Sequence, residues 1–94
     1  MSNLEVANLE AAELTYANLT TANLSDAILT DVFANNAELT GAKLIGASIS
    51  GANLRQALFV NANLKEAAIS SVVRSETDFC GAIMPDGLKG ECKR

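Results

Sequence analysis

Histidine is absent from this chain of 94 residues, and there are only two cysteines. Histidine is the usual general base near neutral pH, so any catalysis would depend on carboxylates or thiols. Glu10 and Glu13 are close in sequence, but we expect them on a solvated face with no apolar pocket to raise a pKa. A zinc site with four ligands is not expected, because the sequence has no histidine and no second cysteine pair. We therefore predict that the protein is not an enzyme and holds no metal or cofactor.

Basic residues are missing from the first 42 positions, the first being Lys43. The basic start of a signal peptide is thus lacking, and no apolar run reaches the length of a membrane-spanning helix. We expect a soluble protein without membrane association, and a cytoplasmic location is favoured over export.

The overall net charge of -4 is unevenly distributed along the chain. Residues 1–42 carry six acidic residues and no basic one, a net charge of -6, whereas residues 43–94 carry five acidic and seven basic residues, a net charge of +2. A surface that binds phosphates should be basic throughout. Direct binding of nucleic acid is therefore not expected.

The chain is dominated by a five-residue repeat with an apolar residue, most often leucine, at the centre of every unit but one, and usually an alanine two places earlier. The centres are Leu4, Leu9, Leu14, Leu19, Leu24, Leu29, Ala34, Leu39, Leu44, Ile49, Leu54, Phe59, Leu64, Ile69, Arg74, Phe79 and Met84. In an α-helix each step of five residues advances by roughly 140°, so the centres would wind over every face. In a flat strand they would alternate between the two faces, because five is odd. The period therefore predicts a chain that turns a corner once in five residues.

Such a coil directs the centres and alanines inward and the other three positions outward. The predicted core stack includes Leu24, Leu44, Leu64, Phe59 and Phe79. The last position of each unit should form the corner, and it often holds residues that tolerate turn geometry. These residues are Asp26, Asp31, Asn36, Gly41, Gly46, Gly51, Asn61 and Gly81.

Two consecutive units, Ala-Asn-Leu-Thr-Thr over residues 17–21 and Ala-Asn-Leu-Ser-Asp over residues 22–26, match the A(D/N)LXX consensus of pentapeptide-repeat proteins. The chain resembles this family over about residues 2 to 86. The resemblance implies an all-β fold, a right-handed quadrilateral parallel β-helix with twenty residues to a coil. About four coils would then make a rod roughly 20 Å long. The Met-Pro-Asp-Gly segment that follows the repeats, residues 84–87, is similar to the ends of small cyanobacterial members.

The two ends of the predicted solenoid differ. We expect residues 1–86 to form the β-helix and residues 87–94 to form a C-terminal capping tail after a turn at Pro85 to Gly87. Cys80 and Cys92 could close a disulfide that holds this tail, which would fit an oxidising compartment; the alternative is two free thiols in a reducing cytoplasm. The N-terminal coil has no such cap, and a homodimer formed by stacking of N-terminal coils is one prediction.

Some outward positions depart from the polar pattern. Ile28, Phe33, Leu58 and Val60 are candidates for an interaction patch, although scattered exposed apolar residues are ordinary on soluble proteins. Arg74 stands at a centre position, where an unpaired guanidinium in an apolar core would be costly. We therefore expect a distorted unit that turns Arg74 outward.

Two functional hypotheses follow. The first is a non-catalytic β-helical binding or scaffold module with an unknown protein partner. The alternative comes from the resemblance, because some longer, dimeric pentapeptide-repeat proteins mimic DNA and bind type II topoisomerases. The acidic residues of positions 1–42 would supply the negative charge for such an acidic modulator, but the repeat spreads them over four faces.

Overall fold

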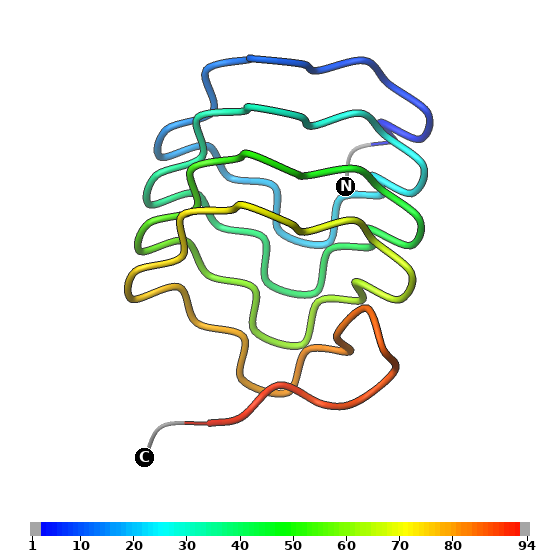
Figure 1. Cartoon of the computed structure of the whole chain (residues 1–94), viewed down its shortest axis with the longest axis vertical. Helices are drawn as coiled ribbons and strands as arrows, with labels where there is room; N and C mark the ends of the chain where they lie inside the picture. The colour runs from blue at the N-terminus through cyan, green and yellow to red at the C-terminus, as the bar shows by residue number, and fades with distance from the viewer. Residues whose placement is uncertain (1–2, 93–94) are drawn as a thin grey trace.

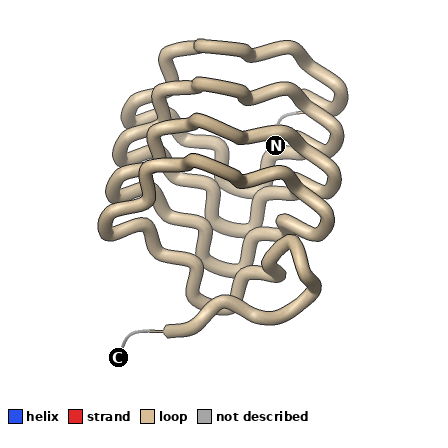
Figure 2. Tube along the Cα trace, in the orientation of Figure 1, coloured by secondary structure: helices blue, strands red, loops and turns tan. Residues whose placement is uncertain are grey.

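The chain winds into a β-helix in the computed structural model, which describes residues 3–92 (Figure 1). Parallel bridges join residues twenty positions apart, from Asn3 with Asn23 to Asn63 with Ile83. Each bridge is an isolated residue pair, so that residues 3–92 contain neither a helix nor a longer strand, and Figure 2 draws these residues as loop. The predicted all-β coil is confirmed at this level.

Hydrogen bonds between stacked coils satisfy much of the backbone. The N–H of Leu24 donates to the carbonyl oxygen of Lys43 (2.7 Å), and the N–H of Lys43 donates to the carbonyl oxygen of Ala22 (2.9 Å). The N–H of Asp26 donates to Ile45 (2.9 Å), and the same three bonds recur in other units. No unit can satisfy its backbone alone, so stability depends on neighbouring coils.

A β-turn closes most units, with the N–H of Ala27 donating to the carbonyl oxygen of Leu24 (3.0 Å) as one instance. The third residue of the turn has positive φ, as in type II turns. All of the corner residues that the repeat predicts, from Asp26 to Gly81, have this conformation. An asparagine before the centre supports the turn: Oδ1 of Asn23 accepts a hydrogen bond from the N–H of Ser25 (3.1 Å). The repeat consensus is thus explained by turn geometry as well as by packing.

The core is a continuous stack of the inward alanines and centres. Leu24, Leu44 and Leu64 are fully buried and occur at intervals of twenty residues. Phe59 is 1% exposed, and its ring stacks on that of Phe79, with centroids 5.2 Å apart and an interplanar angle of 28°. Phe79 itself is partly buried against the core. The five residues predicted for the core stack therefore all face the interior.

Arg74 does not distort its unit. Val73 next to it makes a regular bridge with Asn53, and the turn bond from the N–H of Thr77 to the carbonyl oxygen of Arg74 is present (3.2 Å). The expectation of a distorted unit is therefore wrong. The side chain is nevertheless exposed, because Arg74 lies in the last coil, where no further coil covers the end of the core.

Two glycines test how closely successive corners approach. Gly41 and Gly46 have the same φ, +71°, but a Cβ on Gly46 would lie 2.6 Å from Oδ1 of Asp26, whereas one on Gly41 would lie 3.4 Å from Cγ2 of Thr21. Both alanine variants carry the strain of positive φ, about 1 kcal/mol. We expect Gly46→Ala to lose about 1 kcal/mol more than Gly41→Ala in the free energy of unfolding, measured by chemical denaturation, because the carboxylate must move.

The double variant Asp26→Ala/Gly46→Ala provides the control. Alanine is compatible with this turn position, since Ala11 has a φ of 59°. Removing the carboxylate should therefore abolish the extra cost of the Gly46 substitution. Equal costs for the two glycine substitutions in the wild-type background would show that the two corners do not differ in this way.

Candidate functional site: outward columns and the strapped end

The bridges sort the outward side chains into columns. Ile28 shares a column with Asn8, Ser48 and Ala68; Phe33 with Glu13, Asn53 and Val73; Leu58 with Asn18, Glu38 and Asp78. The four residues predicted for a patch are therefore not gathered on one face. Ile28, Phe33 and Leu58 belong to three successive columns, and Val60 lies in the turn after Leu58.

Exposure separates Phe33 from Val60, whereas Leu58 at 38% is nearly as exposed as Ile28. Phe33 is 49% exposed and Ile28 is 40% exposed, and Val73 in the column of Phe33 is similarly accessible. Val60 is half-buried. Tyr16 is the most exposed large apolar side chain among residues 3–92, and it was not among the predicted site residues. Its sequence signal is a large side chain at a turn position that elsewhere often holds Asp, Asn or Gly.

The acidic residues of the first half are all exposed but belong to different parts of the coil. Glu13 and Glu38 stand in adjoining columns, and Asp26 and Asp31 occupy turns. The Thr15 hydroxyl donates to the Glu13 carboxylate. Within residues 3–92 no cluster of His, Cys, Asp or Glu has the makings of a metal site, and none of the described segments is a helix that could cross a membrane.

The inner surface of the N-terminal coil is only partly covered. Leu4, Leu9, Leu14 and Leu19 are half-buried, in contrast to the fully buried Leu24 of the following coil. These four side chains form the apolar surface that the predicted homodimer would bury. Stacking of two N-terminal coils stays a prediction.

The C-terminal segment, red in Figure 1, folds back on the last coil as a strap, which we define as residues 85–92. Lys89 makes an antiparallel bridge with Ile83, and the N–H of Gly90 donates to the carbonyl oxygen of Ala82 (2.7 Å). Gly90 permits this approach, because a Cβ there would collide with the carbonyl oxygen of Phe79. The boundary between the β-helix (residues 1–86) and the capping tail (residues 87–94) stays a prediction. Residues 1–2 of the first segment and 93–94 of the second lie outside the described part of the chain.

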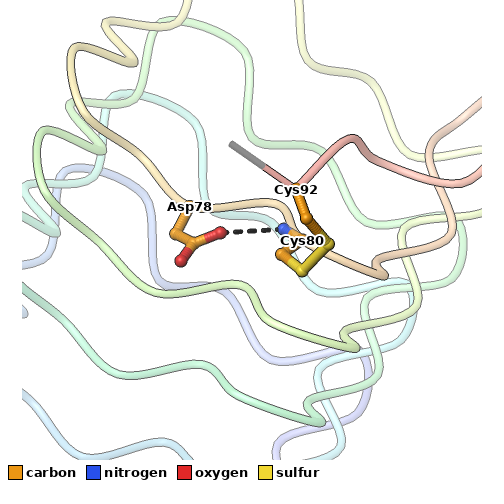
Figure 3. The surroundings of a disulfide bond; sticks show 3 residues. All are labelled: Asp78, Cys80 and Cys92. Atoms are coloured by element: carbon orange, nitrogen blue, oxygen red, sulfur yellow. Dashed lines mark hydrogen bonds between the residues drawn. A yellow bond between two sulfur atoms is a disulfide. The ribbon is translucent and has the colours of Figure 1, made fainter. Parts of the chain in front are cut away.

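A disulfide joins Cys80 of the last coil to Cys92 of the strap, with their Cα atoms 4.4 Å apart (Figure 3). The local backbone is also fixed beside the bond, because the N–H of Cys80 donates to Oδ1 of Asp78 (2.9 Å). The disulfide therefore anchors the far end of the strap to the β-helix.

An open cavity of about 570 Å³ lies between the last coil and the strap. Its lining includes Ile69, Phe79 and Met84 from the coil, Leu88 from the strap, and Arg74. Thr77 also contributes; it is buried, and its hydroxyl donates to the carbonyl oxygen of Leu54 (2.6 Å). No repeat rule predicts this cavity, because the strap that forms one wall does not follow the repeat.

Comparison with known proteins identifies the repeat. The family model for pentapeptide repeats (8 copies) matches residues 2–40, 22–59, 37–73 and 47–85. HetL, a pentapeptide repeat protein involved in heterocyst differentiation regulation from the cyanobacterium Nostoc sp. strain PCC 7120, has a similar solved structure. It is 36% identical, with a TM-score of 0.58, over 94% of this chain and 43% of HetL. These matches imply that the β-helix is right-handed.

Two other solved structures are similar. Rfr23, a pentapeptide repeat protein from the cyanobacterium Cyanothece 51142, is 30% identical with a TM-score of 0.45, over 81% of this chain and 55% of that one. A pentapeptide repeat protein from the Arabidopsis thaliana thylakoid lumen is 28% identical with a TM-score of 0.45, over 86% and 60%. The chain thus spans less than two thirds of the length of each of the three solved relatives. No curated protein sequence gives a significant match.

Proposed function

Because the chain belongs to the pentapeptide-repeat family, we propose that it is a non-catalytic binding module, a quadrilateral rod of about four coils that docks a protein partner through outward apolar side chains. The observation that carries this proposal is the exposure of Ile28 and Phe33 in successive columns. The rod is the scaffold, and the partner determines the biological role. A disulfide between Cys80 and Cys92 fits a protein that works in an oxidising compartment.

Ile28 and Phe33 lie in adjoining columns of the β-helix. A single exposed apolar residue is ordinary on a protein surface, whereas adjoining ones can form the centre of an interface. Ile28 lies in the column before that of Phe33, whereas Val73 lies two coils further along the column of Phe33, with Asn53 between them. Because neighbouring coils hold the backbone of each column, these side chains need little ordering when a partner binds. Leu58 is 38% exposed and Val60 is half-buried, so this pair presents less apolar surface than Ile28 and Phe33 and serves for comparison.

The proposal is tested by affinity capture of a protein partner, followed by measurement of the Kd for the purified partner. The variants are Ile28→Ser/Phe33→Ser and, as the matched control, Leu58→Ser/Val60→Ser. We expect the first pair to weaken binding of the captured partner by at least about tenfold, because each buried apolar side chain contributes roughly 1.5–3 kcal/mol, and the second pair to leave it nearly unchanged. An unchanged Kd for the first double variant, with a wild-type circular dichroism spectrum, would refute docking at Ile28 and Phe33.

The same capture distinguishes the alternative, an acidic DNA mimic that modulates a type II topoisomerase. The observation in its favour is that all six acidic residues of positions 1–42 are exposed and no basic residue accompanies them. A mimic would capture a topoisomerase, and its binding would fall steeply with salt and with Glu10→Gln/Glu13→Gln. The apolar substitutions at Ile28 and Phe33 would then have little effect.

A further inference from the structure

The cavity at the strapped end combines an apolar wall with one unusual cation. Ile69, Phe79 and Met84 come from the end of the core stack, and Leu88 lies across from them on the strap. Arg74 stands among them at a centre position of the repeat, where nearly every other unit has an apolar residue. The volume of about 570 Å³ is within the range of sites that take small organic molecules.

Backbone N–H groups at the edge of the last coil are further hydrogen-bond donors beside Arg74. In the coil before it, the N–H groups of Ile49, Leu54 and Phe59 donate to carbonyl oxygens of the last coil at 2.8, 2.7 and 2.7 Å. Twenty residues further on, the corresponding N–H groups belong to Ile69, Arg74 and Phe79, and these three residues line the cavity. The N–H groups of Ile69 and Phe79 have no backbone acceptor within residues 3–92. The edge beside the cavity therefore offers donors to an anion.

The charged groups of the lining define where an anion would sit. Arg74 is exposed and lines the cavity. Asp86 and Glu91 also line the cavity, together with Lys89. Oδ1 of Asp86 already accepts a hydrogen bond from the N–H of Leu88 (3.0 Å), so this carboxylate is engaged by the backbone of the strap. Among the described lining residues, Arg74 is the one charged side chain that belongs to the coil, whereas Asp86, Lys89 and Glu91 belong to the strap, so an anion would be held on the coil side.

We propose that this cavity binds a small amphipathic carboxylate, of the class of medium-chain fatty acids. The carboxylate is held by the Arg74 guanidinium and by N–H groups of the coil edge, and the hydrocarbon chain lies against Ile69, Phe79 and Met84. A planar guanidinium suits a carboxylate because it can donate two parallel hydrogen bonds. The chain covers apolar surface at the end of the core stack, which no further coil covers.

A titration followed by amide NMR tests the site in the wild-type protein. The probes are sodium octanoate, below its micelle concentration, and octanol, which has the same chain without the charge. We expect saturable shifts at Ile69, Met84 and Leu88, with octanoate binding about tenfold more tightly than octanol because hydrogen bonds to charged groups are the stronger ones. Equal affinities for the two probes, an absence of saturable shifts, or shifts confined to the half-buried leucines of residues 4–19 would each overturn the proposal.

Substitution of the cation gives a second, independent readout. Arg74→Gln should weaken octanoate about tenfold and leave octanol unchanged, whereas Arg74→Lys should retain part of the preference. Arg55→Gln is the matched control, because Arg55 is exposed in a turn and does not line the cavity. An unchanged octanoate affinity in a folded Arg74→Gln protein would overturn the proposal. Should that variant not fold, the comparison of octanoate with octanol on the wild type decides the question.

Discussion

Replacing Phe59 by alanine is expected to lower the free energy of unfolding by about 3–5 kcal/mol. Phe59 is 1% exposed, and its ring stacks on Phe79 at 5.2 Å, so that the substitution leaves a cavity in the core and removes an aromatic contact. Because each coil is supported by its neighbours, the surrounding backbone has little freedom to close the cavity. Chemical denaturation followed by circular dichroism measures the change.

Phe33→Ala is the matched control for this prediction. The same atoms are removed, but from a side chain that is 49% exposed on an outward column. We expect a loss below about 1 kcal/mol, since little apolar surface is returned to water. If the two alanine variants were equally destabilised, the assignment of Phe59 to the inside of the coil and Phe33 to the outside would be incorrect.

Removing the disulfide with Cys80→Ser/Cys92→Ser is expected to cost about 3 kcal/mol in the free energy of unfolding. The bond closes a loop with a sequence separation of 12 residues, and it anchors the strap that covers the last coil. Without it, the strap depends on a few backbone hydrogen bonds, such as those of Gly90 with Gly81 and Ala82. Thermal unfolding of the wild type with and without reductant should show a corresponding decrease in Tm.

The double serine variant also serves as the control for the reductant. Its Tm should be the same in both conditions, because it has no disulfide to lose. Hydrogen exchange should place the effect at the strapped end, with the amides of Gly81 and Gly90 losing protection and that of Leu24 keeping it. A wild-type Tm that does not respond to full reduction would contradict the stabilising role of the bond.

The interior and the corners could be predicted from the sequence because both follow from the five-residue period alone. Leu24, Leu44 and Leu64 are buried because the centre of each unit points inward together with the alanine two residues before it. The turn residues from Asp26 to Gly81 have positive φ, which the turn requires once in every unit. These are local rules, so every repeat is an independent instance of the same rule. The resemblance to pentapeptide-repeat proteins supplied the number of residues per coil.

The candidate sites were harder to predict, because they depend on which units become neighbours and on segments outside the repeat. The period of five residues alone does not show that Leu58 lies in a different column from Ile28 and Phe33; this needs the twenty residues per coil, which the bridges show. Arg74 was expected to distort its unit, but its place in the last coil lets the guanidinium reach solvent with a regular backbone. The cavity depends on the antiparallel strap, for which the repeat contains no rule.

The central claim is that residues twenty apart are neighbours in space, since this spacing builds the core and decides which outward side chains share a surface. Nuclear Overhauser effects between backbone protons test it most directly. The structure predicts cross-coil contacts along the column Glu13, Phe33, Asn53 and Val73, and equivalent contacts along the other columns. Finding those contacts at a spacing of twenty residues would support the account, whereas their absence, with contacts at another spacing instead, would contradict it.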